Sequence, residues 1–262
     1  MSLAKATGVV ISGVDAHIVE VEAHLSAGLP GMSIVGLADT AVGEARDRVR
    51  AAVLNSGARW PQVRITVGLS PASLHKRGSG LDLAIASAIL AADGQIPCEP
   101  LVDAILFGEL GLDGRVRPVR GAVVAAVAAV RSGLDRIVVA ERNAAEAGVV
   151  PGVTAVGVQS LRHWGQVLTG AAVDVVPDPV PEVPGTADPE AGAEPDLADV
   201  LGQAEAVTAL EVAAVGGHHV AMVGRPGVGK TLLAERLPTI LPDLTDEEAL
   251  SVTAIRSVVT DV

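Results

Sequence analysis

Alternating apolar and polar residues predict β-strands in the first part of the chain. The pattern is clearest at residues 63–69, where Arg64 and Thr66 alternate with Val63, Ile65 and Val67, as in a strand with one buried face. Further apolar runs predict strands at 9–12, 17–24 and 32–37.

Helix-like runs follow these strands. At 40–56, apolar residues recur at the spacing of one helix face, and Gly57 follows as a residue suited to end the helix. Helices are also predicted at 81–92 and 122–131, each followed within two residues by a glycine. Early strands that can pair antiparallel, followed by mixed strands and helices, indicate an α/β or α+β fold. The residues expected on the buried face of the first helix are Val42, Ala45, Val49, Ala52 and Val53.

A segment rich in proline and acidic residues, 173–195, interrupts this pattern. Its prolines leave no helix or strand period, and its charges favour an extended, solvated chain. We therefore predict a first domain at 1–171, a linker at 172–196 and a second domain at 197–262.

Composition narrows the class of protein. Phe107, Trp60 and Trp164 are the only aromatic residues, so the core must consist mainly of Val, Ala, Leu and Ile. Cys98 is the single cysteine, which excludes an intramolecular disulfide and a cysteine-based zinc site within this chain. No apolar run reaches the length of a membrane helix. A soluble, cytoplasmic protein is expected.

The net charge of −12 argues weakly against nucleic-acid binding. Eight acidic residues lie between Asp174 and Asp199, where there is no Lys or Arg. This stretch accounts for two-thirds of the net charge, so the overall value decides little about any local surface.

The strongest chemical signal is the sequence Gly-Arg-Pro-Gly-Val-Gly-Lys-Thr at 224–231, which matches the phosphate-binding P-loop Gly-x4-Gly-Lys-Thr. Residues 218–223 predict a short buried strand before it, and 232–237 predict a helix stopped by Pro238. An ordinary glycine-rich turn is the alternative, but the Lys-Thr pair and the flanks favour a nucleotide site. The predicted binding residues are Gly224, Pro226, Gly227, Val228, Gly229, Lys230, Thr231 and Leu232.

Within this motif, Gly227 and Gly229 let the backbone approach the phosphates, and Lys230 supplies a positive charge to the β and γ phosphates. Thr231 is expected to ligate Mg²⁺ that accompanies ATP. Hydrolysis also needs an acidic magnesium ligand, a group that positions water and usually an arginine finger. We identify no catalytic residues beyond the P-loop, expect the printed chain to end inside its ATPase domain, and expect little or no ATP turnover from it.

Several blocks of sequence together closely resemble the YifB/ComM family of magnesium-chelatase-like AAA+ ATPases. The resemblance covers nearly everything outside the linker and is more specific than a P-loop alone. It is carried by the P-loop and by residues 28–37, 44–53, 64–72, 76–83, 108–114, 202–203 and 241–249.

The resemblance implies a first domain with a Lon-protease-like fold, followed by the start of a AAA+ module. ComM-like members are hexameric, ATP-driven DNA helicases that promote branch migration during transformation and recombination. DNA and further copies of the chain are therefore the expected partners, and no membrane is expected. A metal-chelatase or protein-remodelling ATPase is the alternative.

A Lon-like fold also raises the possibility of a Ser-Lys peptidase. Aligned without a gap, the nucleophile position falls on Gly80, with Ser79 one residue away, and the position of the general-base lysine falls on Val123. No lysine lies between Lys76 and Lys230. We therefore expect the fold without the catalytic dyad, and Ser79 to be a turn or cap residue.

Basic residues of the first domain are the remaining candidates. Arg46, Arg48 and Arg50, with the loop at 75–77, could contact DNA phosphates or a neighbouring subunit. Glu44 and Asp47 interleave with the arginines, so a solvated helix face is the interpretation that we favour. His218 and His219 are adjacent on a predicted strand, point to opposite faces and are not expected to share a metal.

Overall fold

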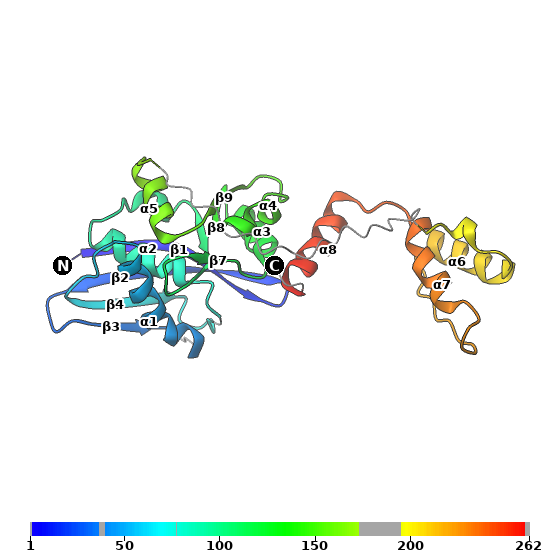
Figure 1. Ribbon diagram of the computed structural model, residues 1–262, viewed down its shortest axis with the longest axis horizontal. Helices are drawn as coiled ribbons and strands as arrows, with labels where there is room; N and C mark the ends of the chain where they lie inside the picture. The colour runs from blue at the N-terminus through cyan, green and yellow to red at the C-terminus, as the bar shows by residue number, and fades with distance from the viewer. Residues whose placement is uncertain (1, 37–39, 77, 173–194, 260–262) are drawn as a thin grey trace. The chain divides into compact units, whose positions relative to one another are not determined.

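The computed structural model describes residues 2–36, 40–76, 78–172 and 195–259, with the side chains of residues 40–43 left out. The chain divides into two compact units (Figure 1). The first comprises Met1–Asp178 and Leu250–Val262, and the second comprises Pro179–Ala249. Residues 173–194 lie outside the described ranges, so the domain boundaries near 171 and 197 stay a prediction.

The first unit is built on a mixed, seven-stranded sheet with the order β3-β4-β2-β1-β5-β8-β9. The β1–β2 and β2–β4 pairs are antiparallel, and the other neighbouring pairs are parallel. A small antiparallel pair, β6 (Glu109–Leu110) and β7 (Val116–Arg117), accompanies it. The strands of the main sheet are β1 (Ser2–Ser12), β2 (Asp15–Ser26), β3 (Gly31–Val35), β4 (Arg64–Ser70), β5 (Ile105–Phe107), β8 (Arg136–Ala140) and β9 (Thr154–Val158).

Helices cover both faces of this sheet, because successive side chains of a strand point to opposite sides. On β5, Leu106 packs into one apolar cluster, whereas Ile105 and Phe107 pack into another. The first cluster includes residues of α1 (Thr40–Asn55), α2 (Asp82–Ala92) and α5 (Leu161–Thr169). The second includes residues of α3 (Ala122–Arg131) and α4 (Glu141–Ala147).

The end of α8 (Asp246–Val259) belongs to the first unit. Leu250 and Ala254 pack against the second cluster, and the carbonyl of Ser257 accepts the Gly121 N–H at 2.8 Å. The Ser257 hydroxyl accepts the Val123 N–H at 3.3 Å. These contacts satisfy donors at the beginning of α3 that its own helix leaves unpaired.

The second unit has a small core centred on Leu197, Leu210 and Leu233. Its longest helix is α6 (Ala204–Gly216), and α7 (Lys230–Arg236) follows the P-loop. Short 3-10 helices occur at Leu197–Asp199 and Leu237–Ile240, and a third lies in the first unit at Glu99–Leu101. No helix in the described part of the chain is long and apolar enough to cross a membrane.

The structure confirms the predicted strands within residues 2–70, although β1 and β2 are longer than the apolar runs that indicated them. It also confirms the helices at 40–56, 81–92 and 122–131 to within a residue at each end. Gly57 adopts a positive φ of 80°, the left-handed conformation expected after a helix. Leu37 and the side chain of Val42 lie outside the described residues.

The predicted strand at 218–223 is wrong for this chain. Its residues form no strand, and Val223 is 99% exposed rather than buried. A parallel strand gains stability from hydrogen bonds to neighbouring strands and from packing on both faces. Residues 195–249 contain no strand that could pair with it.

A buried carboxylate links α1 to α2. Asp82 is 1% exposed and accepts two hydrogen bonds from Arg48, at 2.8 Å to Nε and 3.1 Å to Nη2. The Leu110 N–H also donates to Asp82, at 3.3 Å. Burial raises the pKa of Asp82, while the guanidinium of Arg48 acts in the opposite direction. This pair therefore joins α1 to the beginning of α2.

Replacing Arg48 with Met leaves the buried carboxylate without its cation. We expect the free energy of unfolding to fall by about 3 kcal/mol, whereas Arg46→Met on the exposed face should change it by less than about 1 kcal/mol. Urea unfolding followed by tryptophan fluorescence measures this, since both tryptophans, Trp60 and Trp164, lie in the first unit. Equal losses in the two variants would contradict a special role for Arg48.

The same pair gives the stability a pH dependence of definite sign. Because the pKa of Asp82 is raised, the folded state binds more protons than the unfolded state between the ordinary and the raised value. Stability should therefore fall as pH rises through that interval. In Arg48→Met the interval should extend to higher pH. Unfolding curves measured at several mildly acidic pH values test this prediction. It would be refuted if, as pH rises, the stability of the variant rose relative to that of the wild type.

Candidate functional site: the P-loop

The P-loop lies between α6 and α7 in the second unit. Gly227 and Gly229 have φ values of 83° and 86°, a region that other residues adopt only with strain. Helix α7 begins immediately after them, at Lys230. These two left-handed glycines, separated by Val228, turn the chain tightly, as the motif predicts.

Lys230 folds back over this turn. Its Nζ donates to the carbonyl oxygens of Gly224 and Arg225, at 2.9 Å each. The amine thus lies within the ring of residues 224–230, where the motif requires a positive charge.

At Gly224 and Gly229 the loop has little space for a side chain. A Cβ added to Gly224 would lie 3.1 Å from Cγ2 of Val228, and one added to Gly229 would lie 2.8 Å from Nε2 of Gln203. Bare backbone at these positions fits a phosphate chain, which binds to N–H groups. The residues present thus suit ATP: Lys230 for its phosphates and the Thr231 hydroxyl for the accompanying Mg²⁺.

Sequence analysis did not single out Gln203 as a site residue. It immediately precedes α6 in a left-handed conformation, with φ of 53°, and its amide lies beside Gly229. A non-glycine residue with positive φ is uncommon and marks a position held by its surroundings. The Gly202-Gln203 pair in front of an apolar helix was the signal in the sequence.

The acidic turn that follows, 242–248, forms a helix cap. Glu248 accepts the Thr245 N–H at 2.9 Å and the Thr245 hydroxyl at 2.8 Å, while the Thr245 hydroxyl accepts the Glu248 N–H at 3.3 Å. These donors lower the pKa of Glu248. Among the described residues, no group of three or more His, Cys, Asp or Glu could hold a metal ion.

The residues of the possible peptidase site do not form a Ser-Lys pair. The Ser79 hydroxyl donates to the Glu109 carboxylate, and the Lys76 amine donates to the Pro71 carbonyl. Burial lowers the pKa of Lys76. A side chain at Gly80, where the nucleophile would align, would place its Cβ 2.4 Å from Cε2 of Phe107.

The position where the general-base lysine would align also lacks a catalytic group, because it is occupied by Val123, which is fully buried in α3. A cavity of about 470 Å³ remains beside Ser79, Phe107 and Glu109. It is bordered by a carboxylate rather than by a lysine amine, so these residues lack the base that a Ser-Lys peptidase uses.

The basic residues separate into two groups. Arg48 is engaged by Asp82 and lies 3.7 Å from Glu44, so its role is structural. Arg46 and Arg50 line a pocket on the other side of α1. In the loop at 75–77, Lys76 is buried, and Arg77 lies outside the described residues.

Comparison with known proteins places both parts of the chain. A family model described as subunit ChlI of Mg-chelatase matches residues 21–143, and one described as magnesium chelatase, subunit ChlI, matches residues 196–262. A Lon protease of Trichlorobacter lovleyi is more distantly similar, with 25% identity over 151 residues, 55% of this chain and 18% of the relative.

Other relatives align along nearly the whole chain. An uncharacterized protein of Mycobacterium tuberculosis is 49% identical over 261 residues, 98% of this chain and 50% of the relative. YifB of Escherichia coli is 43% identical over 247 residues, which are 94% of this chain and 47% of the relative. Competence protein ComM of Haemophilus influenzae is 40% identical over 264 residues, which are 99% of this chain and 50% of the relative. The chain spans about half the length of these relatives and belongs to the YifB/ComM family of magnesium-chelatase-like AAA ATPases.

Proposed function

We propose that this chain binds ATP and Mg²⁺ at its P-loop, and that the longer protein uses ATP hydrolysis to move DNA strands. The observation that carries the proposal is the position of Lys230, whose Nζ lies 2.9 Å from two carbonyls of the glycine-turned loop. Membership of an ATPase family supports nucleotide binding independently.

The residues of the loop have separate roles in this proposal. Lys230 exchanges its two carbonyl partners for phosphate oxygens, which carry full negative charge and make stronger hydrogen bonds. Gly227 and Gly229 keep the backbone close to the phosphates, and Thr231 offers its hydroxyl to the metal. Bound Mg²⁺ would supply charge neutralisation at the β and γ phosphates.

DNA is the substrate that we propose for the longer protein. Support comes from the resemblance to ComM-like branch-migration helicases and from the relative that is named a competence protein. We also propose a ring of identical subunits, six in the helicases it resembles, acting in the cytoplasm. A ring allows residues of one subunit to complete the ATP site of the next.

A metal-chelatase motor is the second candidate, because both matching family models carry the chelatase subunit's name. The two functions differ in what stimulates ATP hydrolysis. The test is the ATPase rate of the longer protein with and without forked or four-way DNA, beside a Lys230→Ala variant. Stimulation by DNA that disappears in the variant supports the DNA motor, and robust hydrolysis indifferent to DNA supports the alternative.

The printed chain should bind ATP but hydrolyse it slowly. Lys230→Ala should weaken binding of a fluorescent ATP analogue at least about tenfold, because it removes a charge-assisted contact to the phosphates. Lys230→Arg is a matched control that keeps the charge but not the compact ammonium, and it should retain part of the affinity. Titration followed by fluorescence anisotropy measures this, and unchanged affinity in Lys230→Ala would contradict the assignment.

A further inference from the structure

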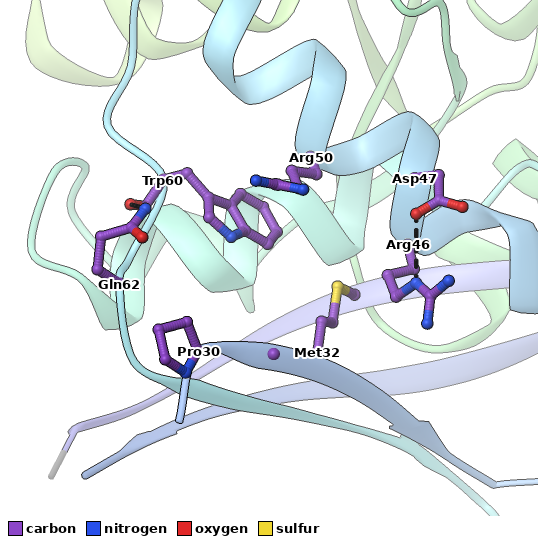
Figure 2. A pocket seen from close by; sticks show the side chains of 8 residues that line it. Pro30, Met32, Arg46, Asp47, Arg50, Trp60 and Gln62 are labelled. Atoms are coloured by element: carbon purple, nitrogen blue, oxygen red, sulfur yellow. Dashed lines mark hydrogen bonds and ion pairs between the residues drawn. The ribbon is translucent and has the colours of Figure 1, made fainter. Parts of the chain in front are cut away.

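A second pocket, of about 320 Å³, lies on the first unit between α1, β3 and the loop that leads to β4. Its lining brings together residues from distant parts of the sequence: Gly31 and Met32 from β3, Arg46 and Arg50 from α1, and Trp60 from the loop. Figure 2 shows the Arg50 guanidinium pointing toward the Trp60 indole, with Met32 below them. The pocket therefore has an apolar floor and a cationic side.

The cationic side consists of two arginines that α1 presents on one face. Arg46 and Arg50 are four residues apart, which places them next to each other on a helix. Arg46 has only a surface pair with Asp47, at 3.3 Å, in which the two side chains are 56% and 77% exposed. Arg50 is exposed and makes no hydrogen bond or ion pair within the described residues. Both guanidinium groups are therefore free to bind an anion at little cost.

The apolar floor is rigid because it belongs to the core. Trp60 is 8% exposed and packs in the first cluster, and Met32 is partly buried against the same cluster. The Gln62 amide donates to the Trp60 carbonyl at 3.1 Å and so holds the loop that carries the indole.

Space for a ligand is open at Gly31. A Cβ added there would have no heavy atom within 4 Å, and its φ is not in the left-handed region. The space above Gly31 is therefore open to a ligand.

We propose that this pocket holds one nucleotide of a DNA single strand, with its phosphate between Arg46 and Arg50 and its base against Trp60 and Met32. Two guanidinium groups suit a phosphodiester, and an indole with a thioether suits a base. A base paired within a duplex is stacked and cannot reach this floor, so a single strand is the form that fits. The inference rests on the proposed function, because it names where the DNA motor holds its strand.

The net charge of the chain does not oppose this site. The eight acidic residues between Asp174 and Asp199 dominate that charge, whereas the pocket itself has two arginines and one aspartate. The local balance is positive, and it is local charge that decides phosphate contacts.

The test is binding of a fluorescent oligothymidylate to the 262-residue chain by anisotropy over a range of salt concentrations. All proteins carry Lys230→Ala, so that the P-loop does not contribute. Arg46→Gln and Arg50→Gln should each weaken binding about tenfold and lower the slope of log K against log salt by about 0.7. The matched control is Arg131→Gln, which removes the same charge from the exposed end of α3 and should leave binding unchanged.

A third variant separates occupation of the pocket from charge. Gly31→Leu fills the open space above the floor without removing a charge, so it should weaken binding about tenfold and leave the salt slope unchanged. Far-ultraviolet circular dichroism and thermal unfolding check that each variant remains folded. If Gly31→Leu does not fold, Gly31→Val, whose branched side chain suits a strand and still enters the open space, should weaken binding measurably.

Several outcomes overturn the proposal. The first two are that the oligothymidylate does not bind, or that Arg131→Gln loses as much affinity as the pocket variants. The other two are that free thymidine monophosphate binds as tightly as the strand, or that an acidic peptide binds at the pocket instead of the strand. Failure here is distinct from failure of the proposed function. If DNA still stimulates the ATPase of the longer protein when it carries Arg50→Gln or Gly31→Leu, the proposed function stands and the proposed pocket is refuted. If the strand binds at the pocket but DNA does not change the rate of ATP hydrolysis, the pocket stands and the proposed function is refuted.

Discussion

The buried ion pair between Arg48 and Asp82 holds helix α1 against α2 in the first unit. A carboxylate that is 1% exposed must be paired, and Arg48 is the guanidinium that reaches it. Once Arg48 is turned inward, the 3.6-residue period of the helix sends Arg46 and Arg50 to the opposite side. The cationic side of the pocket therefore lies away from the ion pair, on a helix whose orientation the ion pair and the apolar stripe at Ala45, Val49, Ala52 and Val53 hold together.

A different constraint governs the second unit. Its P-loop is shaped by local features, namely two left-handed glycines and a lysine that reaches back to loop carbonyls. The strand predicted before the loop, at 218–223, depends on more distant partners, because a parallel strand is stable only beside other strands. The described residues of this unit therefore combine a tightly turned P-loop with a preceding segment, 218–223, that forms no strand and is mostly exposed.

The first unit shows that a fold does not by itself imply one particular chemistry. The place where a nucleophile would align is a glycine whose Cβ would clash with Phe107, and Val123 is packed in the core. Ser79 and Lys76 each donate to a different acceptor. The sheet thus supplies a scaffold, and we propose that its functional surface lies at α1 and β3 rather than at the positions where a Ser-Lys pair would align.

Sequence pattern predicted the elements whose signal is local. β4 alternates cleanly, and α1 has an apolar stripe and a terminal glycine, so both were found. The sequence pattern did not predict β5, β8 and β9, and β5 shows the reason. Ile105–Phe107 is buried on both faces, so its sequence is a continuous apolar run without the alternation that indicates a strand. The P-loop was predictable because its glycines and lysine act within eight residues. The Gly202-Gln203 pair marked a position of interest, but the place of the Gln203 amide beside Gly229 was not predictable. The division of the arginines between Asp82 and the pocket was not predictable either, since both features depend on contacts between distant segments.

The most direct test of the central claim follows a labelled four-way DNA junction in the presence of the longer protein. Dissociation of the junction is recorded with ATP and with a non-hydrolysable analogue. The account predicts that the junction separates only with ATP and that Lys230→Ala abolishes separation. A junction that stays intact while ATP is consumed, or one that separates equally with the analogue, would contradict an ATP-driven DNA motor.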